Sequence, residues 1–172
     1  MNIKETIAII NQMQADGVIG KYAIGGAVGA TFYLEPADTQ DVDIFVALNA
    51  PVGQSIVTLT PIYEYLIARG CQPDKEYIII SGWPVQILSA ESPLLQEALE
   101  QSVERDFAGI PVRVFTAEHL VALALQTGRS KDHIRIGQFC EAGVLNEPRF
   151  QSILERHGLL DLWAKFKKRF DI

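Results

Sequence analysis

Residues 24–33 read IGGAVGATFY and residues 41–48 read DVDIFVAL, and these two stretches decide the fold that we expect. The apolar run 22–24 predicts a short strand, the pair Gly25 and Gly26 a turn, and residues 27–33 a helix. Glycines let the backbone approach an anion closely, and a helix N-terminus offers unpaired N–H groups. Strand, glycine turn and helix in this order are typical of a phosphate-binding segment.

Asp41 and Asp43 stand at the start of a second apolar run, which predicts a central strand over residues 43–48 that is covered on both faces. Residues two apart in a strand project to the same side, so the two carboxylates are expected side by side. Such a pair favours a divalent cation, Mg²⁺ or Mn²⁺, that binds phosphates at the same time. The alternative is a polar strand entrance, with Asp41 in a turn and Asp43 solvated.

With these residues the chain resembles the polymerase-β-like nucleotidyltransferase superfamily, in which a G-G or G-S turn opens a helix and a D-x-D strand binds the catalytic metal. The resemblance covers about residues 22–88, and the chain looks most like small bacterial members akin to abortive-infection toxin nucleotidyltransferases. It implies an α/β fold with a mixed β-sheet, flanking helices and a helical C-terminal portion. It also implies metal-dependent transfer of a nucleoside monophosphate from a nucleoside triphosphate to an acceptor, which can be a small molecule, an RNA end or a protein.

The resemblance assigns roles to individual residues. Asp41 and Asp43 would be catalytic metal ligands, and Gly25 and Gly26 would cradle the triphosphate. Thr39 stands where relatives often carry Ser or Thr, so its hydroxyl would meet a phosphate or cap the loop.

Gln86 occupies the position where the family carries its third carboxylate, in the segment WPVQIL at 83–88. A glutamine offers hydrogen bonds and a carbonyl oxygen, but it is not a general base at neutral pH. Three explanations stay open: Asp74, Glu76 or Glu91 replaces the missing group, the enzyme works with two aspartates, or the fold only binds nucleotide. In the last case the chain would be a catalytically impaired nucleotide-binding module. A further alternative is a toxin–antitoxin-type interaction module on the same fold.

A second motif, TGRSKDHIRIGQF at 127–139, places three cations within about two helical turns. Lys131 and Arg135 are four residues apart and so lie on one helix face. The resemblance extends to an R-x-K-D segment that faces the cleft, which makes Lys131 catalytic and Arg129 and Asp132 nucleotide-binding. The alternative is a solvated helix start in which Asp132 favours the helix dipole and pairs with Arg135.

The chain of 172 residues is 48% hydrophobic and 21% charged with a formal net charge of −6, which is the composition of an ordinary globular protein. We expect a catalytic core over 1–115 and a packed helical portion over 116–172. No apolar run or leader predicts a membrane span, so a cytoplasmic protein with reduced Cys71 and Cys140 is expected. The negative charge argues against general nucleic-acid binding, though a nucleotide, an RNA end or a protein partner is still compatible with it.

Periodicity predicts the remaining elements. Helices are expected over 2–14, 62–68, 94–103, from 116, and over 130–142, 147–157 and 159–170, with strands over 77–80, 85–88 and 112–115.

Overall fold

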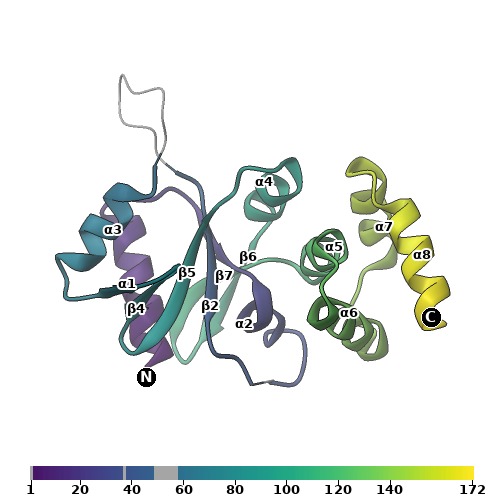
Figure 1. Cartoon of the computed structure of the whole chain (residues 1–172), viewed down its shortest axis with the longest axis horizontal. Helices are drawn as coiled ribbons and strands as arrows, with labels where there is room; N and C mark the ends of the chain where they lie inside the picture. The colour runs from purple at the N-terminus through teal and green to yellow at the C-terminus, as the bar shows by residue number, and fades with distance from the viewer. Residues whose placement is uncertain (1, 37, 49–57) are drawn as a thin grey trace.

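The computed structural model describes residues 2–36, 38–48 and 58–172, and the strands of this part form one mixed sheet of seven strands (Figure 1). The strand order is β3-β4-β5-β2-β1-β7-β6. In the centre, β2 runs antiparallel to β1 and parallel to β5, while β1 runs parallel to β7. The bounds are β1 Tyr22–Ile24, β2 Val42–Val46, β3 Gln72–Asp74, β4 Tyr77–Ile80, β5 Trp83–Ser89, β6 Val103–Phe107 and β7 Ile110–Val114.

Local sequence signals explain where several helices begin and end. The side chains of Asn2, Ser92, Thr116 and Asn146 cap helices by accepting a backbone N–H three residues later. The helices are α1 Ile3–Ala15, α2 Gly26–Ala30, α3 Thr60–Ile67, α4 Pro93–Glu100, α5 Ala117–Thr127, α6 Ser130–Ala142, α7 Glu147–Arg156 and α8 Leu160–Phe170.

One face of the sheet is covered by α1 and α3, which lie together on the left in Figure 1. Ile7, Ile10 and Met13 of α1 and Ile62 and Leu66 of α3 are buried there. They pack against the inward side chains of the strands, which on β2 are every second residue. This alternation leaves the other set of β2 side chains, Asp43 and Phe45, on the opposite face.

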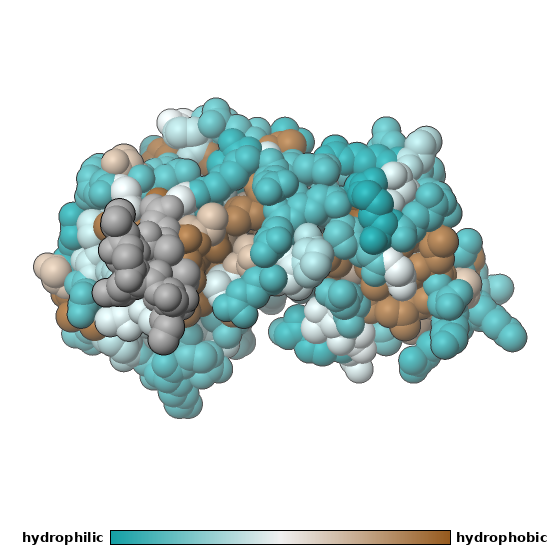
Figure 2. All heavy atoms as spheres, turned by 90° about the horizontal axis from the view of Figure 1, so that it is seen from above, coloured by the Kyte–Doolittle hydropathy of each residue, from teal (hydrophilic) through white to brown (hydrophobic). Residues whose placement is uncertain are grey.

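The second core lies on that opposite face. There, helices of the C-terminal portion pack against the sheet and against the helices α2 and α4. α5 is its centre and is buried along most of its length. The helices α6, α7 and α8 complete the portion, and Figure 2 shows a hydrophobic patch over it. Ile134 of α6 and Leu162 and Phe170 of α8 are exposed apolar side chains of this C-terminal portion.

The predicted α/β architecture, a mixed sheet with flanking helices and a helical C-terminal portion, is confirmed. Two strands were not predicted, β3 and β6, and β6 begins at Val103, where a helix was expected to end. The central position of β2 is confirmed, and its two faces pack against the two cores, with Phe45 against the second. On that second face the side chains of Asp43 and Phe45 are only partly buried. The division at residue 115 stays a prediction.

No helix in the described ranges is long and apolar enough to cross a membrane. Cys71 and Cys140 are free thiols.

Candidate functional site

The two aspartates lie at the start of β2, on the face of the sheet that α1 and α3 leave uncovered. Asp41 precedes the strand, which begins at Val42, so the pair spans the strand entrance instead of lying wholly within it. Both side chains are partly buried and line one cleft of about 250 Å³. The Tyr77 hydroxyl donates a hydrogen bond of 3.2 Å to Asp41 Oδ2.

The glycine pair makes room for Asp43. The backbone N–H of Gly25 donates to the Asp43 carbonyl at 3.0 Å. Gly26 has a φ of 55°, and a Cβ atom there would lie 1.9 Å from Asp43 Oδ2. A Cβ atom at Gly25 would lie 2.6 Å from Phe45 Cε2. A larger residue at either position therefore collides with a side chain of β2, which gives the pair a packing role whether or not it also contacts phosphate.

Burial raises the pKa of the Asp43 carboxyl above its ordinary value, and the neighbouring Asp41 carboxylate raises that pKa further. The cations Lys131, Arg129 and Arg135 act in the opposite direction. The ionised pair is thus only partly compensated by the protein. A divalent cation fits this donor set, because two carboxylates are the usual protein contribution to a site that Mg²⁺ shares with phosphates and water.

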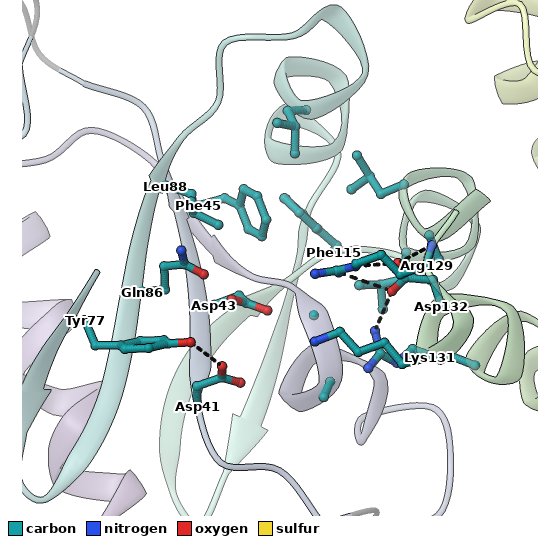
Figure 3. A pocket seen from close by; sticks show the side chains of 17 residues that line it. Asp41, Asp43, Phe45, Tyr77, Gln86, Leu88, Phe115, Arg129, Lys131 and Asp132 are labelled. Carbon is teal, nitrogen blue, oxygen red and sulfur yellow. Dashed lines mark hydrogen bonds and ion pairs between the residues drawn. The ribbon is translucent and has the colours of Figure 1, made fainter. Parts of the chain in front are cut away.

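The opposite wall of the cleft is cationic and comes from Arg129, the N-cap of α6, and from Lys131 and Arg135 in the first two turns of that helix. In Figure 3 the side chains of Arg129 and Lys131 reach toward the aspartates from across the cleft. Lys131 is exposed and forms no hydrogen bond or ion pair with another residue of the described part. Its ammonium group is therefore available to an anion in the cleft.

The buried carboxylate of Asp132 contacts both arginines of this wall. Only 1% of Asp132 is exposed, and its carboxylate accepts from Arg129 Nε at 2.7 Å and from Arg129 Nη2 at 3.2 Å. It also accepts the Arg129 backbone N–H at 3.2 Å, which satisfies one of the free backbone donors at the start of α6. Arg135 Nη1 lies 3.7 Å from Asp132 Oδ1. The predicted pairing of Asp132 with Arg135 is present, and both arginines still line the cleft.

Gln86 lies beside Asp43, because β5 pairs with β2 in the register Asp43↔Gln86. Its side chain also lines the cleft. None of the three candidate replacements, Asp74, Glu76 and Glu91, is among the described residues that line it. The carboxylates of the cleft within the described part are therefore Asp41, Asp43 and the arginine-bound Asp132.

Thr39 and Gly25 support the site from outside it. The Thr39 hydroxyl donates to the Asp41 carbonyl at 2.9 Å, which fixes the loop that leads into β2. Of the nine residues predicted for the site, these two do not appear among the described cleft residues, and the other seven do: Gly26, Asp41, Asp43, Gln86, Arg129, Lys131 and Asp132.

Tyr77 and the apolar side of the cleft were not predicted from the sequence. Phe45 follows Asp43 by two residues and Leu88 follows Gln86 by two, so strand alternation was the available signal for both. No sequence signal marked Tyr77, because β5 separates its strand from β2.

The histidines take no part in the cleft. His119 is fully buried, with its Nε2 3.1 Å from Glu97 Oε1 and its Nδ1 2.8 Å from Thr116 Oγ1. Across the described ranges, no group of three or more His, Cys, Asp or Glu residues is arranged to hold a metal ion. A metal at Asp41 and Asp43 would accordingly take its remaining ligands from substrate and water.

Comparison with known proteins was made by sequence and by structure. No protein-family model and no curated protein matches the chain. Among solved structures, it is similar to an antigenic nucleotidyltransferase-like protein from Paracoccidioides brasiliensis, with a TM-score of 0.58, 14% identity, and coverage of 94% of this chain and 90% of that one. It is also similar to ANT(2″)-Ia in complex with adenylyl-2″-tobramycin, with a TM-score of 0.52, 13% identity, and coverage of 96% and 98%.

The solution structure of the antibiotic-resistance factor ANT(2″)-Ia gives a TM-score of 0.53 at 12% identity, with 98% of this chain and 97% of that chain covered. These likenesses extend over nearly the whole chain, and the proteins share its architecture at low sequence identity. The chain therefore has the nucleotidyltransferase fold.

Proposed function

We propose that this protein transfers a nucleoside monophosphate from a nucleoside triphosphate to a hydroxyl acceptor, with Mg²⁺ or Mn²⁺ as cofactor. The observation that carries the proposal is the pairing of opposite charges across one cleft, with Asp41 and Asp43 on the sheet and Arg129, Lys131 and Arg135 on the helical wall. A metal triphosphate presents both a cation and a polyanion, so it complements both walls. The nucleotidyltransferase fold of the chain supports the same reaction.

Asp41 and Asp43 would hold the metal, which supplies charge neutralisation at the phosphates. Tyr77 orients the Asp41 carboxylate by its hydrogen bond. Lys131 would bind the departing pyrophosphate, because preorganised cations stabilise the charge that develops on it. Asp132 would keep Arg129 turned toward the phosphates without contacting them itself.

Gln86 would donate a hydrogen bond to the nucleotide beside the metal and would take no proton. The acceptor hydroxyl would attack the α-phosphorus in line, and pyrophosphate would leave on the opposite side. Correct placement of these two groups is itself a large part of catalysis.

The test is pyrophosphate release from each of the four nucleoside triphosphates with Mg²⁺ or Mn²⁺ and a panel of acceptors that includes tobramycin, RNA ends and proteins. Asp43→Asn removes a metal ligand at nearly constant volume, and Asp74→Asn, an exposed aspartate on β3, is the matched control. We expect release with the wild type and the control and a loss of at least about 100-fold with Asp43→Asn. Equal rates in the wild type and Asp43→Asn would refute the proposal.

The resemblance to abortive-infection nucleotidyltransferases adds a cellular expectation. Induced expression of the wild type should arrest bacterial growth, and Asp43→Asn should not. Growth arrest by both proteins would place toxicity outside this cleft.

A further inference from the structure

One side of the cleft is apolar and is not used by the proposed chemistry of the phosphates. Phe45 of β2, Leu88 of β5, Leu95 of α4 and Leu123 of α5 line it, and all four are only partly buried. We call these four residues the apolar wall. Figure 3 shows Phe45 and Leu88 beside Asp43 and Gln86, and Figure 2 shows hydrophobic atoms in the recess between the sheet and the C-terminal helices.

The apolar wall begins one step along the strands from the metal ligands. Phe45 pairs with Leu88 in the same register that pairs Asp43 with Gln86, and both pairs face the cleft. A step of two residues along a strand is roughly 7 Å. A ligand group a few bonds away from the reacting phosphorus therefore reaches this wall.

The wall suits an apolar group better than a nucleobase. The polar edges of a base need hydrogen-bond partners when they leave water, and unpaired edges cost free energy. The four residues of the apolar wall, and the buried Phe115 and Leu120 that line the same cleft, have no polar side-chain atoms. The apolar wall also offers no carboxylate to the ammonium groups of an amine-rich acceptor, and Arg129, Lys131 and Arg135 line the other wall of the cleft.

We propose that the acceptor carries its hydroxyl on an uncharged apolar or aromatic scaffold, which packs against the apolar wall while the nucleotide occupies the charged part of the cleft. This inference rests on the proposed function, because it assigns the second substrate of the same site.

Ligand-observed saturation-transfer NMR tests it without turnover. The probes are 4-nitrophenyl β-D-glucopyranoside, methyl β-D-glucopyranoside, which lacks the aromatic ring, and tobramycin. Each is measured on the full chain with Mg²⁺ and a non-hydrolysable ATP analogue. We expect the nitrophenyl glycoside to bind in the presence of the analogue and the methyl glycoside to bind at least about tenfold more weakly, because burial of a ring contributes well over 1.4 kcal/mol.

Leu123→Gln should weaken binding of the nitrophenyl glycoside about tenfold or more. Leu162→Gln, on the exposed face of α8, should leave this binding unchanged. Equal binding of the two glycosides, or preferential binding of tobramycin, would overturn the inference. Displacement of the nitrophenyl glycoside by the ATP analogue would also overturn it, because the wall would then hold the base. The comparison of probes uses the wild type and so does not depend on how Leu123→Gln folds.

The same experiment separates the two proposals. Simultaneous binding of analogue and nitrophenyl glycoside supports the apolar subsite even where no pyrophosphate is released. Absence of release with every acceptor would then count against the proposed transfer alone.

Discussion

The substitution Gly26→Ala tests how the cleft holds Asp43, the proposed metal ligand. Gly26 has a φ of 55°, and an added Cβ atom would lie 1.9 Å from Asp43 Oδ2. The left-handed backbone costs an alanine about 1–2 kcal/mol. The contact is far shorter than any real one, so the Asp43 side chain or the turn must also move. Gly26→Ala should therefore lose stability and metal binding together.

Gly143→Ala is the matched control, because Gly143 has a φ of 61° and an added Cβ atom there meets nothing within 4 Å. The free energy of unfolding of Gly143→Ala should fall by the same amount, about 1–2 kcal/mol, while the site stays intact. Urea unfolding measures the stability of both variants, and calorimetry or Mn²⁺ electron paramagnetic resonance measures metal affinity. Loss of a residue that supports a metal ligand lowers metal affinity about 10–100-fold, so displacing the ligand itself should lower the affinity by at least this factor. A metal affinity of Gly26→Ala within twofold of the wild type would show that Gly26 is not needed to place the Asp43 carboxylate at the metal.

Three further substitutions test the electrostatics. Because the pKa of Asp43 is raised in the folded protein, the free energy of unfolding falls as pH rises from the ordinary aspartate pKa through the raised one. Asp43→Asn removes this ionisation and should therefore raise the free energy of unfolding of the metal-free protein at pH 7, measured by urea titration. Asp132→Ala should lower the free energy of unfolding by about 1–3 kcal/mol, because Arg129 loses its hydrogen bonds, and should raise the KM for the nucleoside triphosphate in steady-state kinetics. The hydrogen bond from Arg156 is the main cause that lowers the pKa of Glu97 to about 2. The ionised Glu97 therefore stabilises the folded protein above pH 4.5, and this stabilisation is lost as pH falls toward 2. Glu97→Gln should flatten that part of the stability–pH curve and cost about 1–3 kcal/mol at pH 7. No change with Asp132→Ala, or an unaltered acid transition with Glu97→Gln, would contradict these assignments.

Much of the fold was predictable because its signals are local. The apolar run after Asp43 predicted β2, and the periodicity of the C-terminal helices predicted α6, α7 and α8 within a residue or two. β6 was missed because VERDF, at residues 103–107, carries three charged residues on an exposed strand and so lacks a buried stripe. Its pairing with β7 decides its structure.

The polar part of the site was predictable, whereas its arrangement was not. The family resemblance predicted that Asp41, Asp43 and Lys131 share one cleft, and all three line it. It did not reveal that Gly26 makes space for a carboxylate, because that follows from the packing of α2 on β2. It did not reveal Tyr77 either, since a residue two strands away enters the site only through the strand order.

The proposed function requires that Asp41 and Asp43 bind a divalent metal that holds a nucleoside triphosphate against the cationic wall. The most direct measurement is the Kd of a non-hydrolysable ATP analogue by calorimetry, with and without Mg²⁺, for the wild type, Asp43→Asn and the control Asp74→Asn. We expect the analogue to bind at least about tenfold more tightly with Mg²⁺ in the wild type and the control, and Mg²⁺ to have no effect on its affinity in Asp43→Asn. Equal affinity with and without Mg²⁺ in the wild type, or full retention of the Mg²⁺ effect in Asp43→Asn, would contradict it.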